Sequence, residues 1–160
     1  MGERGVAAPM GEIADRAGVA VGTLYRHYPT KQDLVAAVAA DSVLRIATEA
    51  EAALRRTDRG APPGHELAEL VASVARTHVN DRVFKQAAGS AQSDAGVPPA
   101  GSAAARAWQA VATLLARAQA AGDVRTDVGV DDLVVLLTGA PDDDQRLPIY
   151  LAVVLAGLRT

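Results

Sequence analysis

The chain has 160 residues, of which 49% are hydrophobic, 22% charged and 3% aromatic, a composition typical of one globular unit or of a small module joined to a larger one. Alanine, the strongest helix former, makes up about a fifth of the residues, which predicts an all-helical fold. The absence of cysteine excludes disulfides, thiolate metal sites and thiol nucleophiles. The net charge of −3 argues against a surface that is basic throughout and coats nucleic acid.

The sequence contains no recognisable membrane span or targeting signal. The most apolar stretch, residues 147–158, is about half the ~20 residues that a membrane helix needs. The first residues lead into no apolar segment, and Val6 stands where a myristoylation signal needs Ser or Thr. We therefore expect a soluble, cytoplasmic protein that does not bind a membrane.

Two short helices are predicted near the start of the chain. Apolar residues recur at helical spacing over residues 10–17, and Gly18 supplies the left-handed residue that ends such a helix. A second helix is expected from Val21 to Tyr28, because Pro29 disfavours helical geometry in the residue before it.

A long third helix and several later ones are expected in the rest of the chain. Thr30 and Asp33 have the spacing of a capping box, and no helix breaker follows until about Arg56. Such a helix is about 40 Å long and outspans one small domain, so we expect it to link two. The later helices are predicted at residues 66–80, 82–88, 102–121, 133–137 and 147–159.

A short basic segment stands out against the acidic remainder of the chain. Residues 16–31 contain Arg16, Arg26, His27 and Lys31 and no carboxylate, whereas residues 57–160 carry all the excess acid. This distribution indicates either a local anion site or a solvated helix face. The pattern of two short helices joined by a glycine turn favours the first reading, because it is that of a helix-turn-helix, whose second helix enters the major groove of DNA.

Residues 10–38, MGEIADRAGVAVGTLYRHYPTKQDLVAAV, closely resemble the DNA-binding segment of the TetR family of bacterial transcriptional regulators. The resemblance implies an all-helical protein with a helix-turn-helix segment at 1–45 and an effector-binding and dimerisation domain at 46–160. It implies a ligand-responsive repressor, released by a small molecule from a near-palindromic operator in double-stranded DNA. It implies neither enzymatic activity nor a cofactor.

The resemblance also assigns roles to individual residues of the second helix and its flanks. The expected DNA-binding residues are Ala20, Val21, Gly22, Thr23, Tyr25, Arg26, His27 and Lys31. Ala20 stands where the family usually has a capping Ser, and Val21 replaces a residue that is often polar, so a thymine methyl is its expected contact. Leu24 and Tyr28, four residues apart, are expected to hold the helix to its scaffold.

The family's domain begins with a further amphipathic helix, for which the residues before Glu3 leave no room. That helix covers the apolar face that includes Ile13, Val19 and Leu24. We therefore expect either a start further upstream or, as the alternative function, a helical ligand-binding or dimerising module that has lost specific DNA binding.

The expected effector cavity and dimer interface lie in the second domain. Trp108 is expected either to anchor the core or to line an effector cavity together with His78 and Phe84, and the effector is expected to be mostly apolar or amphipathic. Residues 147–158 are apolar on nearly all sides, as a helix buried between two subunits would be. Replacing Leu151 or Leu155 with Asp is expected to yield a monomer or an aggregate.

The sequence gives little support for a metal site or for enzymatic activity. The histidines at 27, 65 and 78 have no mutual spacing suited to a metal, so no metal site is expected. The run Asp142 to Asp144 lacks the Gly and distal Glu of a calcium loop and indicates a solvated surface. Nucleophile elbows and phosphate-binding loops are missing, which argues against an enzyme.

Overall fold

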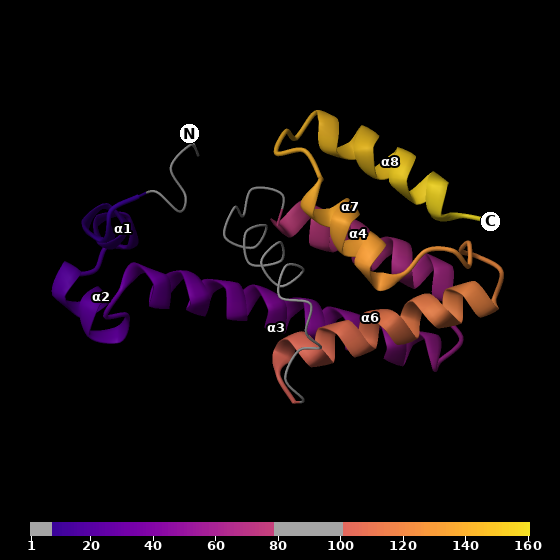
Figure 1. Cartoon of the computed structure of the whole chain (residues 1–160), viewed down its shortest axis with the longest axis horizontal. Helices are drawn as coiled ribbons and strands as arrows, with labels where there is room; N and C mark the ends of the chain where they lie inside the picture. The colour runs from indigo at the N-terminus through magenta and orange to yellow at the C-terminus, as the bar shows by residue number, and fades with distance from the viewer. Residues whose placement is uncertain (1–7, 79–100) are drawn as a thin grey trace.

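The computed structural model describes residues 8–78 and 101–160, and these residues contain helices and no strand. Two short helices precede one long helix (Figure 1). Two of the later helices pack against the second half of that long helix, and the last two pack on those in turn. The helices are α1 (Met10–Ala17), α2 (Val21–His27), α3 (Lys31–Thr57), α4 (Pro63–His78), α6 (Ala103–Ala120), α7 (Val130–Thr138) and α8 (Arg146–Leu158).

The first two helices form a small unit at one end of α3. Gly18 ends α1 with a left-handed φ of 69°, as the sequence predicts, and its N–H and that of Val19 return to carbonyls of α1. Met10, Ala14 and Leu24 are buried together in this unit. We call this unit, residues 8–34, the head.

The long helix α3 is continuous from the head into the rest of the molecule. The predicted capping box is present: the Thr30 hydroxyl accepts from the N–H of Asp33, and the Asp33 carboxylate accepts from the N–H of Thr30 at 2.9 Å. Leu34 packs against the head, whereas Ala50 and Ala53 are fully buried in the larger core. The two cores therefore meet opposite ends of one helix.

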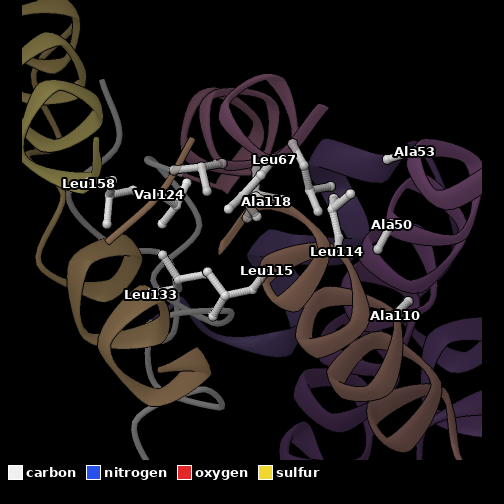
Figure 2. Close-up of a cluster of buried hydrophobic side chains, with 13 residues drawn as sticks. Ala50, Ala53, Leu67, Ala110, Leu114, Leu115, Ala118, Val124, Leu133 and Leu158 are labelled. Carbon is white, nitrogen blue, oxygen red and sulfur yellow. The ribbon is translucent and has the colours of Figure 1, made fainter. Parts of the chain in front are cut away.

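The larger core lies among α3, α4, α6, α7 and α8, which we call the body (Figure 2). Leu67 of α4 and Leu114 of α6 are its largest fully buried side chains. Alanines of α3 and α6 face one another there, which allows the two helices to lie close together. The labelled side chains in Figure 2 are Ala50, Ala53, Leu67, Ala110, Leu114, Leu115, Ala118, Val124, Leu133 and Leu158.

The last two helices cover one side of α4. The carboxylate of Asp132 accepts from the N–H of Gly129 at 2.7 Å and so closes the start of α7. Leu147 and Leu151 of α8 are buried against Ala72 and Ala75 of α4. Leu151 is thus part of the core of its own chain, so its substitution would disturb this core, and its effect on a dimer stays a prediction.

Two expectations about the body are wrong: the start of α4 and the alternative in which Trp108 anchors the core. The helix α4 begins at Pro63, not near Glu66, because proline suits the first turn of a helix, where its missing N–H has no partner to lose. Trp108 is 39% exposed on α6 and therefore does not anchor the core. The helix expected at residues 82–88 lies outside the described residues.

Candidate nucleic-acid interface

Nearly every side chain of α2 is exposed. Leu24 is the one buried residue of this helix, at 9% exposure, and it points into the head core with Met10 and Ala14. Tyr28, the residue after α2, is half-buried against the same core. The expectation that Leu24 and Tyr28 hold the helix to its scaffold is confirmed, and the rest of α2 forms a free surface.

The free surface of α2 contains residues that are predicted from the sequence to contact DNA. Val21 is 45% and Tyr25 49% exposed, and a Cβ added at Gly22 would meet nothing within 4 Å. The surface therefore combines a methyl-rich start, a phenol and cationic groups, which are the groups that read base edges and phosphates. Its exposed members are Ala20, Val21, Gly22, Thr23, Tyr25, Arg26 and His27.

The start of α2 carries no side-chain cap. Ala20 is the N-cap residue, and its carbonyl accepts from the N–H groups of Thr23 and Leu24 at 2.9 and 3.3 Å, but its methyl side chain cannot accept a hydrogen bond. A serine at this position typically contributes about 1 kcal/mol. The beginning of α2 is therefore held by the turn at Gly18 and by the burial of Leu24.

The charges around α2 are arranged unevenly. Arg16 is paired with Glu12 one turn earlier in α1 at 2.9 Å, whereas Arg26, His27 and Lys31 form no ion pair within the described residues. Lys31 is half-buried in the first turn of α3. Three donors with free polar ends thus lie between the end of α2 and the start of α3, on a surface suited to a phosphate.

Of the three residues proposed for effector binding, the structure describes the side chain of Trp108 alone, which lies on the outside of α6. His78 is the last residue of α4, and its side chain and Phe84 lie outside the described part of the chain. Within the described ranges, no group of three or more His, Asp or Glu side chains is placed to hold a metal ion. None of the helices in these ranges is long and apolar enough to cross a membrane.

An apolar face lies on the outside of α8, and the sequence did not reveal which of its residues form this face. Ile149 and Val153 are 67% and 68% exposed, and Ala152 and Ala156 lie exposed beside them at helical spacing. We call these four residues the α8 outer face. The signal was present in the sequence, but a helix that is apolar all round does not reveal which of its faces points outward.

Comparison with protein families divides the chain into two matched parts. Residues 1–38 match the family model described as bacterial regulatory proteins of the tetR family. Residues 62–160 match the model for the C-terminal domain of SbtR-like transcriptional regulators. A search of curated protein sequences gives no match.

Several solved structures are similar over nearly the whole chain, and each comparison covers 99% of it. The TetR transcription regulatory protein from Mycobacterium vanbaalenii is 38% identical, with a TM-score of 0.61 over 87% of its length. The TetR transcriptional regulator SCO0520 from Streptomyces coelicolor is 28% identical (TM-score 0.64, 91% of its length). The TetR family protein CprB from S. coelicolor A3(2) is 27% identical (TM-score 0.56, 81% of its length). With both family models matched and the exposed α2 in place, the chain belongs to the TetR family of transcriptional regulators.

Proposed function

We propose that this regulator is a repressor that binds a near-palindromic operator through the free surface of α2 and is released by a small molecule. The observation that carries the proposal is the exposure of seven predicted contact residues on α2 and its N-cap, while Leu24 is the one buried residue of the helix. The match of residues 1–38 to the family's DNA-binding model speaks against the alternative, a module that has lost DNA binding.

The proposed division is a DNA-binding segment at 1–45 and an effector-binding and dimerisation domain at 46–160. It is supported by the two cores on α3, because Leu34 contacts the head and Ile46 is the first α3 residue packed against the body core. His78, Phe84 and Trp108 remain the proposed effector residues. The proposed ligand is mostly apolar or amphipathic, and it must bind the form without DNA more tightly, because equal affinity shifts no equilibrium.

The proposed dimer interface is the α8 outer face. Ile149 and Val153 each expose about two thirds of their surface, and two copies related by a two-fold axis would remove these side chains from water. Such a dimer would place two α2 helices in successive major grooves, about 34–36 Å apart.

The experiment is footprinting and fluorescence anisotropy on the intergenic DNA beside the protein's own gene. Thr23→Ala and Tyr25→Ala should weaken the complex by roughly tenfold each, and Lys31→Ala should weaken it on every sequence and lower the salt slope by about one. Arg59→Ala, which removes an exposed cation beyond the end of α3, is the matched control and should change neither value. If no protected, salt-sensitive site is found, the repressor proposal fails.

A further inference from the structure

A cleft opens at the end of the body remote from α1 and α2. Three segments converge there: the loop before α4 with the first turns of that helix, the turn after α6, and the end of α8 (Figure 1). Its volume is about 380 Å³, within the range of about 300–1,000 Å³ that small-molecule sites occupy. The cleft shares no residue with the proposed effector site or with the α8 outer face.

The floor of the cleft is apolar and continuous with the body core. Leu67, Val124 and Leu158 are buried members of that core, and Figure 2 shows Leu158 and Val124 next to one another between α8 and the segment after α6. Ala68 and Leu155 are half-buried at its sides. A hydrocarbon chain entering the cleft would therefore meet methyl groups from α4, the α6–α7 segment and α8.

The rim is held in place by hydrogen bonds that join the three segments. The N–H of Gly64 donates to the Asp123 carboxylate at 3.0 Å, the N–H of Arg125 donates to the carbonyl of Leu158 at 3.0 Å, and the hydroxyl of Thr160 donates to the carbonyl of Gly122 at 2.8 Å. The cleft is thus preformed, so little conformational entropy is lost when a ligand enters.

The polar side chains of the rim differ in whether they already have a hydrogen-bond or ion-pair partner. The Asp123 carboxylate already accepts a hydrogen bond from the start of α4. Neither the imidazole of His65 nor the guanidinium of Arg159 has a hydrogen bond or ion pair with the described residues, and both side chains are exposed beside the apolar floor. A free guanidinium next to a methyl-lined cleft matches a ligand with a carboxylate head and an apolar tail.

We propose that this cleft binds a small amphipathic carboxylate, with its tail over Leu67 and Leu158 and its carboxylate on Arg159. The cleft also lies beside an ion pair that connects α3 to α4. Glu66, adjacent to Leu67 in α4, is paired with Arg56 near the end of α3. A ligand that contacts Leu67 therefore lies next to the ion pair that connects α4 to α3, the helix that carries the head. Only an effect of this ligand on DNA binding rests on the proposed function.

Binding is tested first in the absence of DNA, by methyl-group NMR of the full chain titrated with octanoate, octan-1-ol and octylamine. Octanoate should give saturable shifts of the Leu67, Val124, Leu155 and Leu158 methyl groups and leave Leu44, exposed on α3, unmoved. Octan-1-ol should bind more weakly, and octylamine weakest of all. Octylamine binding as tightly as octanoate, or no saturable shift at these four residues, would overturn the proposal.

Two variants locate the ligand within the cleft. Arg159→Gln should weaken octanoate by about tenfold, because a charge-assisted hydrogen bond is lost, and should leave octan-1-ol unchanged. Ala68→Phe should fill the cleft and abolish binding of both, whereas Ala116→Phe, the same change at an exposed position of α6, should abolish neither. Unchanged octanoate affinity in folded Arg159→Gln and Ala68→Phe would sink the assignment.

The link to DNA is then measured separately. Octanoate should weaken operator binding of the unchanged chain, and should have no such effect on the Ala68→Phe variant. If octanoate shifts the cleft methyl groups while no operator is found, the proposed function fails and the cleft stands. If operator binding is measured and octanoate leaves every methyl group unmoved, the reverse holds.

Discussion

Arg56 and Glu66 join α3 to α4 through a single oxygen atom. Both Nε and Nη2 of Arg56 lie within 2.8 Å of Oε2 of Glu66. The Glu66 side chain is 8% exposed and that of Arg56 is 51% exposed, so the carboxylate depends on a partner that itself reaches solvent. The hydrogen bond from Arg56 to Glu66 raises the pKa of the guanidinium above its ordinary value.

Removing Arg56 should therefore cost more than removing a surface arginine. Arg56→Ala leaves a buried carboxylate without its cation and should lower the free energy of unfolding by roughly 1–3 kcal/mol. The control is Arg106→Ala, which breaks the exposed pair with Glu51 and should cost less than about 1 kcal/mol. Urea denaturation measures both, and equal losses would contradict the different burial of the two carboxylates.

Substitutions of Gly22 and Gly64 should affect different properties, DNA binding at the first and stability at the second. At Gly22 in α2 an added Cβ meets no atom within 4 Å, whereas at Gly64 it would lie 2.4 Å from the Cβ of Asp123. Gly22→Ala should leave the unfolding free energy equal or up to about 1 kcal/mol higher and weaken DNA binding, because the methyl group enters the proposed contact surface. Gly64→Ala should destabilise the chain by roughly 1–3 kcal/mol. Thermal unfolding and anisotropy distinguish the two outcomes, and the reverse order would refute both placements.

The two faces of α8 should respond differently to charge. Val153→Asp changes a residue that is 68% exposed and should give a folded monomer, whereas Leu151→Asp buries a carboxylate in the core and should unfold the chain. Light scattering reports the mass, and circular dichroism reports the fold. A Val153→Asp protein that remains a dimer would move the interface away from the α8 outer face.

The head should open more easily than the body. Among the residues that the structure describes, the hydrophobic cluster of the head contains three buried residues, whereas the main cluster of the body contains thirteen. Because local stability follows local buried contacts, the amides of α1 and α2 should exchange with solvent at least about tenfold faster than those of α6. Hydrogen exchange of the free protein measures this difference, which Leu24→Ala should widen and Leu114→Ala should narrow. Similar protection in α1 and α6 would show that contacts outside this small core stabilise the head.

Tyr150 gives a dependence on pH. Its hydroxyl donates to the carbonyl of Leu136 at 2.6 Å, and burial raises the pKa of the phenol above its ordinary value of 10.0. The stability from the neutral phenol is therefore complete below about pH 10 and is lost as the pH rises through the folded-state pKa. Tyr150→Phe should cost about 1 kcal/mol at pH 8, and this difference should shrink at pH 11. A constant difference would contradict the assignment.

The helix ends of the head were predictable because their chemistry is local. Gly18 needs only its own backbone freedom to end α1, and Thr30 and Asp33 cap α3 through residues three apart. The roles of Leu24 and Tyr28 followed for the same reason, since two residues four positions apart lie on one face of a helix. Such features are written within a few residues of sequence.

Features of the body that depend on distant residues were not predictable in this way. The periodicity of Trp108 gave it apolar neighbours along α6, but only the packing of α3 and α4 determines that it lies outside. Leu151 and Val153 are equally apolar and differ in which of them faces α4. The cleft near Arg159 requires residues more than 90 positions apart, such as His65 and Arg159, to converge.

The uninterrupted α3 turns small movements of the body into larger movements of the head. From Ala53, fully buried in the body, to Leu34, packed against the head, the helix rises about 28 Å. A rotation of about 5° at the body end would therefore carry the far end sideways by roughly 2–3 Å, about the length of one hydrogen bond. In a symmetric dimer the two displacements add. The two α2 helices would then no longer match the spacing of successive major grooves, although each head would keep its own fold.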